Sequence, residues 1–513
     1  MKQRRYAAKT VIMIVMVFAL LVSACSGGGS NSANTGNEPD AGNGDGGSGD
    51  LKPVELVMVF PVGGEPKDLK LVSDEINKLT KEKINATVKL IPIGFGAWAQ
   101  QKTLMMSGNE QVDLIVSGLN TYSQDVAKGQ FLELDSYLEQ QGQGIKEALD
   151  SLDPAFLNAT RIDGKIYAVP SIRDLAADYG ITMRRDLVEK YNIDTSAIKS
   201  LDDLDAVFKV IKDNEPEMIP TVKYGTSILD IYVQTFFDVL GDGFGVLPGH
   251  DNGLKVVNMY ETPEYAALLN TVRRWNEAGY VAKDAATSTE TQYNMVKSGK
   301  AFSFISHMKP GIETQESRTT GKDMVSVHFR PPVTMTSNII SIMWSVARNS
   351  KDPDRAMMLL NLMYTDKDLI NLLDYGIEGK HYEKVSDNII DYPQGVDATN
   401  SGYNLQMGWM FGNQSLSYIW NGDDPELWNQ LADFNRSATK SKALGFTFNA
   451  DAVKTEIAAV TNVQNQYKVA LETGMIDPAS KLPEFIKQLK SAGIDKIVAE
   501  KQKQLDAWAA ASK

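Results

Sequence analysis

The chain has 513 residues, which is long enough for about three domains of ordinary size or for fewer, larger lobes. It carries 52 Lys and Arg against 65 Asp and Glu, so its formal net charge is −13, and it contains only one Cys. The negative charge argues against nucleic acid or an anionic membrane surface as a partner, and the single Cys excludes an internal disulfide framework and a cysteine-based zinc or iron–sulfur site.

The first 24 residues have the pattern of a secretory signal peptide. Residues 2–9 contain four Lys or Arg, and residues 11–22 form an apolar run that is too short to cross a hydrocarbon core of ~30 Å as a helix. The run ends in the tetrapeptide VSAC at residues 22–25, which resembles the bacterial lipobox, where processing leaves the Cys as a lipid-modified amino terminus. We therefore predict lipidation of Cys25. The alternative is ordinary cleavage near Ala24, with no role for the thiol.

Residues 25–50 are predicted to be a flexible tether behind this anchor. After Cys25 the segment has no large apolar, aromatic or basic side chain, so it cannot bury surface. No later apolar run is long enough to span a membrane. We therefore expect the body of the chain on the extracellular face of the cell membrane, attached through the lipid anchor only.

From residue 54 onwards, predicted strands alternate with predicted helices. This alternation favours an α/β fold with a parallel sheet covered by helices on both faces. In such sheets ligands bind beyond the carboxyl ends of the strands, so the loops after the first three strands are candidates for a site. The predicted elements are strands Val54–Phe60, Ala86–Ile93 and Val112–Val116, and helices Asp68–Thr80 and Ala97–Ser107.

Several later segments carry a resemblance to one known family. They are DGKIYAVP (163–170), MRRDLV (183–188), KAFSFI (300–305) with the loop that follows it, the strand and helix of 338–348 and 353–356, and residues 376–382, 409–414 and 492–495. On these residues the chain resembles the extracellular solute-binding proteins of ABC importers, of the carbohydrate type, and within them a subgroup of large Gram-positive lipoproteins.

The resemblance implies a two-lobe, periplasmic-binding-protein-like α/β fold, with the ligand in a cleft between lobes that are joined by several hinge crossings. We expect crossings near 167–174 and 328–333, where Pro170 and the pair Pro331-Pro332 would stiffen a linker without donating to a β ladder. The alternative is that these prolines mark ordinary loop ends. The expected lobes are 54–167 plus 334–385, and 175–327 plus about 390–513.

Catalytic and cofactor motifs are scarce. The sequence has no Walker A loop, no Gly-x-Ser-x-Gly elbow and no His-Glu-x-x-His motif, and its four His residues lie far apart. We therefore expect no enzyme activity, no cofactor and no metal. A pair of acids for glycoside hydrolysis is defined by separation in space, so a surface glycoside hydrolase stays open as an alternative.

Aromatic residues are the first candidates for ligand binding. A pyranose ring has an apolar face and a rim of hydroxyl groups, and Trp or Tyr supplies both a flat platform and a donor. Trp98 and Trp344 lie near predicted strand ends, and Trp409 and Trp420 flank a segment rich in Gly and Asn. For each of them the alternative is core packing. Trp275, Trp428 and Trp508 are interpreted as structural.

Polar residues near the crossings and strand ends complete the predicted site. Asn120 and Tyr122 follow a buried strand, Arg173 and Asp174 follow the first crossing, and His307 follows the strand of residues 302–305. These side chains could bind sugar hydroxyl groups, and Arg could bind a uronate carboxylate. Hinge capping is the alternative for Arg173 and Asp174, and a solvated loop for His307. The further candidates are Tyr179 and Glu378.

These observations predict a monomeric, lipid-anchored receptor that captures a carbohydrate, expected to be an oligosaccharide, and delivers it to the permease subunits of an ABC transporter. A peptide-binding import receptor is the alternative within transport. The glycoside hydrolase is the alternative among enzymes.

Overall fold

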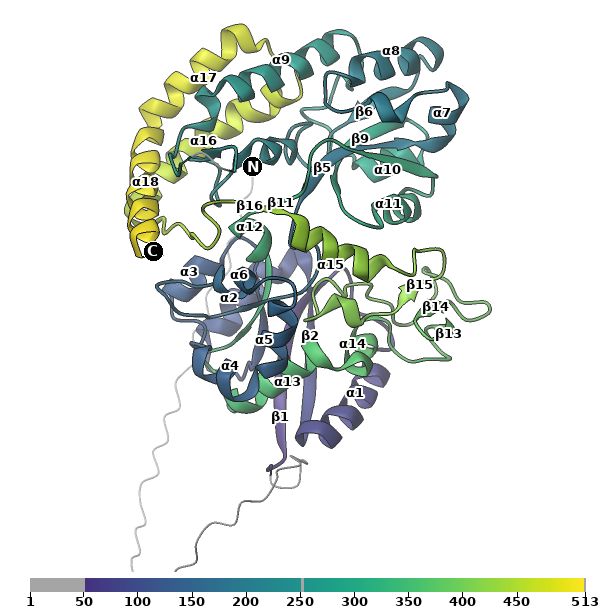
Figure 1. Cartoon of the computed structure of the whole chain (residues 1–513), viewed down its shortest axis with the longest axis vertical. Helices are drawn as coiled ribbons and strands as arrows, with labels where there is room; N and C mark the ends of the chain where they lie inside the picture. Colours follow the sequence, from purple (N-terminus) through teal and green to yellow (C-terminus); the bar gives the residue numbers. More distant parts are fainter. Residues whose placement is uncertain (1–50, 251–252, 512–513) are drawn as a thin grey trace, which may run out of the picture. The chain divides into compact units, whose positions relative to one another are not determined.

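The computed structural model describes residues 51–250 and 253–511. The predicted signal peptide, Cys25 and the tether up to residue 50 lie outside the described residues. Within them, two separate hydrophobic cores organise two α/β lobes, as expected for the fold class. Lobe 1 comprises about 54–172 and 335–437, and lobe 2 about 177–330 and 446–511 (Figure 1).

Lobe 1 contains a five-stranded sheet whose apolar strands are buried on both faces. β1 pairs in parallel with β2 and β3, whereas β12 is antiparallel to β3 and β4. The three strands predicted from the sequence are confirmed to within a few residues. In sheet order the strands are β2 (Ala86–Gly94), β1 (Val54–Val62), β3 (Leu114–Gly118), β12 (Ile342–Val346) and β4 (Val169–Pro170).

Helices cover this sheet because each presents an apolar face to it. In α1 (Leu69–Ile84), Val72 and Ile76 are buried, and the helix ends at Asn85 in a left-handed conformation (φ 46°). In α13 (Pro353–Thr365), the Asp352 side chain accepts the backbone N–H of Arg355 and caps the first turn. The other α-helices around this core are α2 (Phe95–Ser107), α3 (Tyr122–Ala127), α4 (Asp135–Gln141), α5 (Gln143–Asp150), α6 (Pro154–Asn158) and α14 (Lys367–Asp374).

Residues 383–437 extend lobe 1 beyond its expected boundary. Strands β13 (Glu383–Ser386), β14 (Ile389–Asp391) and β15 (Ile419–Trp420) form a small sheet, followed by α15 (Leu427–Ser437). Phe411 lies in the core of lobe 1, with its ring 5.3 Å from that of Phe60. The expected assignment of everything after about 390 to lobe 2 therefore does not hold for this segment, because its apolar side chains pack against β1.

Lobe 2 is built on a four-stranded sheet in the order β10 (Met324–His328), β5 (Asp178–Arg184), β9 (Ala301–Met308) and β6 (Ile219–Val222). β5 is antiparallel to β9 and β10, and β6 is parallel to β9. The carboxyl-terminal helices α16 and α17 pack against α9, and α18 packs against α16 and α17, as the yellow ribbons of Figure 1 show. The helices of this lobe are α7 (Arg185–Lys190), α8 (Leu204–Asn214), α9 (Pro263–Glu277), α10 (Gln292–Lys297), α11 (Ile312–Thr320), α16 (Lys454–Glu472), α17 (Pro478–Ala492) and α18 (Ile494–Ala511).

Three crossing segments join the lobes. The first and second meet at an antiparallel bridge between Ala177 and Val333. The second continues as β11 (Val333–Thr334), which pairs in parallel with β16 (Thr439–Lys440) of the third. The expected lobe boundaries imply this third crossing near residues 385–390, and the structure has it later, at β16, because residues 383–437 stay with lobe 1 before α16–α18 complete lobe 2.

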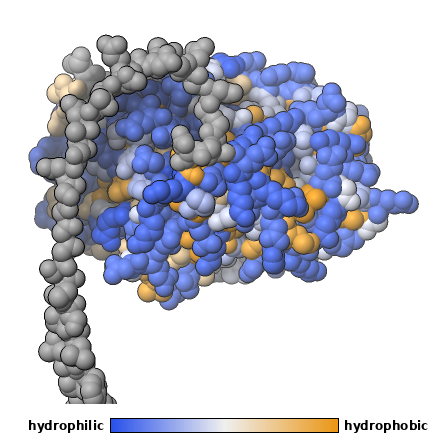
Figure 2. Space-filling model, turned by 90° about the horizontal axis from the view of Figure 1, so that it is seen from below, coloured by the Kyte–Doolittle hydropathy of each residue, from blue (hydrophilic) through white to orange (hydrophobic). Residues whose placement is uncertain are grey.

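Apolar side chains lie mainly in the cores, and polar side chains lie mainly on the surface. On the face drawn in Figure 2, hydrophilic residues cover most of the surface and hydrophobic residues occur in small groups. Within residues 51–250 and 253–511, no helix has the length and apolar character needed to cross a bilayer.

Candidate functional site

A groove between the lobes is the candidate site. It consists of three pockets of about 610, 450 and 640 Å³, here called the aromatic pocket, the central pocket and the α3 pocket. Asn120 and Ser341 line all three, so the pockets are neighbours. Of the loops after the first three strands of lobe 1, the one after β3 borders these pockets, because it carries Asn120.

Lobe 1 supplies the aromatic wall of the first pocket. Trp409, Trp420 and Trp428 line it together with Tyr375 and Tyr418. The Trp428 indole donates to the Ser417 carbonyl at 2.7 Å, which orients its ring. The Trp420 indole nitrogen is buried and has no hydrogen-bond partner in the described part of the chain. This wall therefore offers several aromatic faces and an unused donor.

The floor of the aromatic pocket contains a buried carboxyl group. Asp374 accepts the backbone N–H of Met407 at 2.6 Å and the Ser417 hydroxyl at 3.3 Å. Burial raises the pKa of Asp374 to about 6, although these hydrogen bonds oppose the shift. Gly408 lies directly over it, and a Cβ there would be 2.7 Å from Asp374 Oδ2. The absence of a side chain at residue 408 therefore lets the chain pass close to this carboxyl group.

Lobe 2 supplies the opposite wall through the start of α11 and the loop before it. Lys309, Gly311, Gln315 and Arg318 line the aromatic pocket from this side. Gly311 precedes α11 with φ 77°, a conformation that favours glycine and turns the chain into the helix. Charged and amide groups thus face the aromatic wall across the groove.

The central pocket is more polar. Tyr224, Tyr293, His307 and Glu316 line it from lobe 2. Burial lowers the pKa of His307 to about 4, against the attraction of Asp174, so its imidazole is neutral near pH 7. His307 therefore presents one donor and one acceptor to the pocket rather than a charge.

The first crossing forms the edge between the aromatic and central pockets. The Arg173 guanidinium donates to Asp174 Oδ1 at 2.5 Å and to the Asn338 carbonyl at 3.2 Å, and it also contacts the Ser341 hydroxyl. Burial alone would raise the pKa of Asp174, but the charges of Lys309 and Arg173 and the hydrogen bond from Arg173 lower it to about 2. Arg173 and Asp174 stabilise the hinge and also line both pockets, so hinge capping and ligand binding are compatible roles for them.

The structure brings six of the predicted binding residues to the groove. Asn120 lines all three pockets, Arg173 lines two, Trp409 and Trp420 line the aromatic pocket, and His307 lines the central pocket. Tyr122 lines the α3 pocket, although its hydroxyl is engaged with the Thr160 carbonyl at 2.7 Å.

The other four predicted residues lie elsewhere. Trp344 is fully buried in the core of lobe 1, and its indole donates to the Met410 carbonyl at 2.6 Å. Trp98 is buried in the same core on α2. Tyr179 packs beneath His307, with ring centroids 5.2 Å apart, and Glu378 pairs with Lys384 at 2.9 Å on the surface. None of the four lines the three pockets.

Several groove residues were not predicted. Trp428 was interpreted as structural, and Tyr418, Lys309, Gln315, Arg318, Glu316, Tyr224 and Tyr293 were not considered. The density of aromatic residues between 403 and 428 was the available signal for the aromatic wall. No comparable signal marks the residues from α11, since polar residues on a short helix are usually solvated.

The described residues hold no cluster of three or more His, Cys, Asp or Glu side chains arranged to bind a metal ion. The ionisable groups of the groove are instead paired with one another or buried separately.

The chain is similar to known proteins over most of its length. Residues 65–370 match the family model of bacterial extracellular solute-binding proteins, and residues 442–510 match a domain of unknown function, DUF3502. A carbohydrate ABC transporter substrate-binding protein of Streptococcus pneumoniae is 31% identical over 476 residues, covering 90% of this chain and 91% of the relative. The polygalacturonan/rhamnogalacturonan-binding protein YtcQ of Bacillus subtilis is 21% identical and covers 74% of each chain.

The same likeness appears among solved structures. The N-glycan transport solute-binding protein NgtS of S. pneumoniae matches with a TM-score of 0.81 at 29% identity, covering 90% of this chain and all of that chain. Its complexes with Man1GlcNAc and Man5GlcNAc match with TM-scores of 0.72 and 0.70. Because these are structures of one protein, the lower scores mean that its conformation in the complexes is less similar to the present structure.

Proposed function

Because this chain belongs to the bacterial extracellular solute-binding proteins, we propose that it captures an oligosaccharide in the groove between its lobes and delivers it to the permease of an ABC importer. The aromatic wall is the observation that carries this proposal. Trp409, Trp420 and Trp428 offer indole rings to a groove whose other wall is polar. Sugars need that combination of a stacking face and hydrogen-bonding groups.

The length of the groove favours an oligosaccharide over a single sugar. Three neighbouring pockets, with Asn120 common to all, give room for more than one sugar unit. The NgtS protein of S. pneumoniae was solved with Man1GlcNAc and Man5GlcNAc, so mannose-containing N-glycan fragments are the first probes to use.

Calorimetry with a defined ligand panel tests this function. The panel contains Man1GlcNAc, Man5GlcNAc, a galacturonan oligosaccharide and an unstructured peptide of similar length. We expect saturable binding of at least one oligosaccharide and none of the peptide. Binding of the peptide alone would favour the peptide-import receptor and overturn the proposal.

We also infer that the protein transports its ligand unchanged. Two groove carboxyl groups, Asp174 and Asp374, are engaged in hinge or backbone hydrogen bonds. Among the described residues that line the central pocket, Glu316 has no free carboxyl partner with which it could act as an acid–base pair across a glycosidic bond. Incubation of the tightest-binding oligosaccharide with the protein should return it intact. Release of a shorter sugar, lost when a groove carboxyl is replaced, would show a glycoside hydrolase instead.

The anchor belongs to the same proposal. The basic and apolar leader followed by Cys25, the single Cys of the chain, supports a lipoprotein held at the outer face of the cell membrane. Cys25→Ser should leave the ligand affinity unchanged and move the protein from the membrane fraction to the soluble or unprocessed fraction. An unchanged membrane fraction would contradict lipid anchoring.

A further inference from the structure

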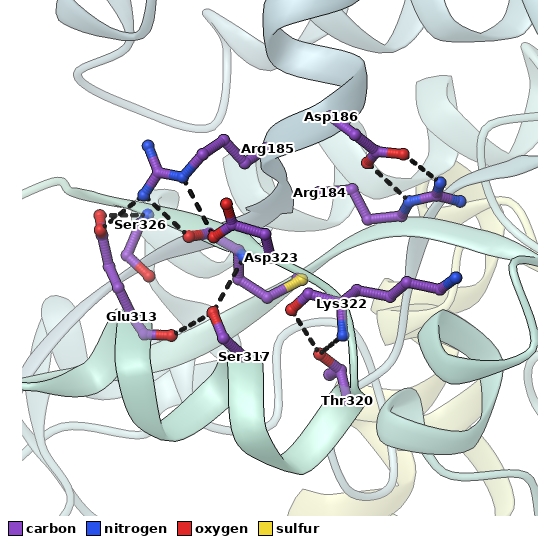
Figure 3. Close-up of polar contacts among 10 residues, drawn as sticks. Arg184, Arg185, Asp186, Glu313, Ser317, Thr320, Lys322, Asp323 and Ser326 are labelled. Carbon is purple, nitrogen blue, oxygen red and sulfur yellow. Dashed lines mark hydrogen bonds and ion pairs between the residues drawn. The ribbon is translucent and has the colours of Figure 1, made fainter. Parts of the chain in front are cut away.

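One side of helix α11 holds the helix to lobe 2. Glu313 accepts the backbone N–H of Ser326 at 2.8 Å with Oε1 and the Arg185 guanidinium at 2.9 Å with Oε2. One turn later, the Ser317 hydroxyl accepts the backbone N–H of Met324 at 3.0 Å. Figure 3 shows these contacts on one side of the helix, with Arg185 reaching both Glu313 and Asp323. These contacts hold this side of the helix to lobe 2.

The neighbouring side of the helix turns Glu316 towards the central pocket. Glu316 is only 2% exposed, yet it lines this pocket. Its Oε1 is within 3.3 Å of the Ser306 hydroxyl, and its Oε2 has no hydrogen-bond partner among the described residues. A buried carboxyl oxygen without a partner costs free energy, and native structures leave few such atoms unsatisfied. Holding α11 to lobe 2 does not explain the buried carboxyl group of Glu316, because Glu313 and Ser317 already make the contacts that hold the helix.

The surroundings of Glu316 suit a hydrogen bond from an uncharged donor group of a ligand. It forms no ion pair with any residue in the described ranges, although the Lys309 charge is near enough to affect it. Tyr224 and Tyr293 line the same pocket, so the carboxyl group lies among aromatic rings. Burial raises the pKa of Glu316 to about 7, which the Ser306 hydrogen bond and the Lys309 charge oppose.

We propose that Glu316 is a specificity-determining residue of the central pocket, whose free Oε2 accepts a hydrogen bond from a hydroxyl or amide N–H group of the sugar unit bound there. This proposal rests on the proposed function, since it assigns one sugar unit of the same ligand. The aromatic pocket then binds sugar faces with little regard to their substituents, while the central pocket selects the unit that carries a correctly placed donor.

Substitution on these two neighbouring sides of α11 tests the proposal. Glu316→Ala should weaken binding of the tightest-binding panel member, Man1GlcNAc or Man5GlcNAc, by about tenfold or more, because a hydrogen bond to a carboxyl group is lost. Glu313→Ala is the matched control on the same helix. It should lower the melting temperature and change the affinity of the folded protein by about twofold or less. Equal affinities of wild type and Glu316→Ala would overturn the proposal.

Ligand analogues then identify the donor. Replacing the acetamido group of Man1GlcNAc by a hydroxyl group removes the amide N–H, and deoxy analogues remove single hydroxyl groups. The analogue that lacks the relevant donor should lose affinity for the wild type and lose little more for Glu316→Ala. If every analogue loses the same factor in both proteins, Glu316 does not contact the ligand. If the wild type binds no sugar of the panel, the proposed function fails, which is a different outcome.

A pH series gives a readout that a structural role would not change. A donor hydrogen bond favours the carboxylate, so binding lowers the pKa of Glu316 and affinity should rise as the pH increases towards 7. The groups that line the central pocket with Glu316 include Arg173 and Asp174 of the first crossing, Tyr224, Tyr293 of α10, Ser306 and His307 of β9, and Lys309 after β9. The pKa of His307 is about 4 and burial raises those of both tyrosines, so none of these three titrates between about pH 5.5 and 8.

Glu316→Gln is the variant for this series, because it keeps the size of the side chain and cannot ionise. Asp374 in the aromatic pocket has a pKa of about 6 and contributes its own dependence to both proteins. The difference between the wild-type and Glu316→Gln profiles therefore isolates Glu316. Superimposable profiles would overturn the proposal.

Discussion

Arg318 and Asp423 form an ion pair across the groove, with 2.8 Å between the guanidinium Nη1 and the carboxylate Oδ1. Arg318 comes from α11 of lobe 2 and Asp423 from the loop between β15 and α15 of lobe 1. The Asp423 side chain is 6% exposed and that of Arg318 46%. Beside this pair Leu427 packs against Gly311, where an added Cβ would be 2.8 Å from Leu427 Cδ1. The two lobes therefore touch at the rim of the aromatic pocket as well as at their crossings.

Breaking the pair should change the separation of the lobes. Because the Asp423 side chain is only 6% exposed, Arg318→Met leaves a buried carboxylate without its partner, so the melting temperature should also fall. Without the contact at the rim, we expect a larger radius of gyration of the ligand-free protein in small-angle scattering. Arg274→Met is the control, because Arg274 is similarly exposed and pairs with Asp202 and Asp205 inside lobe 2. An equal radius in both variants would contradict the role of the pair.

Two tryptophans should respond in opposite ways to truncation. Trp409 lines the aromatic pocket, so Trp409→Ala should weaken oligosaccharide binding by at least about tenfold with a near-native melting temperature. Trp344 is fully buried, so Trp344→Ala should cost about 3–5 kcal/mol of folding free energy while the folded fraction still binds. Calorimetry and thermal unfolding of both variants check this. Early melting of Trp409→Ala with unchanged affinity would assign Trp409 to packing.

A methyl group at residue 408 should disturb the floor of the aromatic pocket. The Cβ of Gly408→Ala would be 2.7 Å from Asp374 Oδ2 and 2.8 Å from the Ser417 hydroxyl, so one of them must move. We expect a loss of about 1–3 kcal/mol in stability, with weaker ligand binding. Gly63→Ala is the control, since no atom lies within 4 Å of a Cβ added there. If both substitutions are tolerated equally, the crowding at Gly408 is relieved by small shifts.

Glu316 should make stability depend on pH in a defined direction. Its pKa rises from 4.5 to about 7 on folding, so its protonated form favours the folded state. The associated stability is present below about pH 4.5 and is lost as the pH rises through 7. Glu316→Gln should therefore gain stability relative to the wild type between about pH 5 and 8, by up to ~3 kcal/mol, in chemical denaturation.

Asp174→Asn is the matching control for this series. The pKa of Asp174 is about 2 in the folded protein, below its usual value of 3.8, so its contribution is present above about pH 4 and constant between pH 5 and 8. The stability difference between Asp174→Asn and the wild type should therefore stay level over that range. A level difference for Glu316→Gln as well would show that Glu316 is not perturbed on folding.

The sequence by itself determined the local elements and the family resemblance. The apolar run of β1 and the amphipathic spacing of α1 identify a strand and a helix, because the periodicity of apolar residues is a property of residues close together in the sequence. Asn120 was found in the same way, since the carboxyl end of a buried strand in an α/β sheet faces a ligand site. Arg173 and His307 follow from the positions of the crossing and of β9.

The tertiary structure alone decided which aromatic residues face the groove. Trp344 and Trp409 are both candidate binding residues from the sequence, yet the first is buried beside Met410 and Phe411 while the second lines the aromatic pocket. Glu316 likewise acquires its environment from β9, α10 and the first crossing, which lie far apart along the chain. The exposure of a side chain depends on which distant segments pack over it, and no local pattern of residues carries that information.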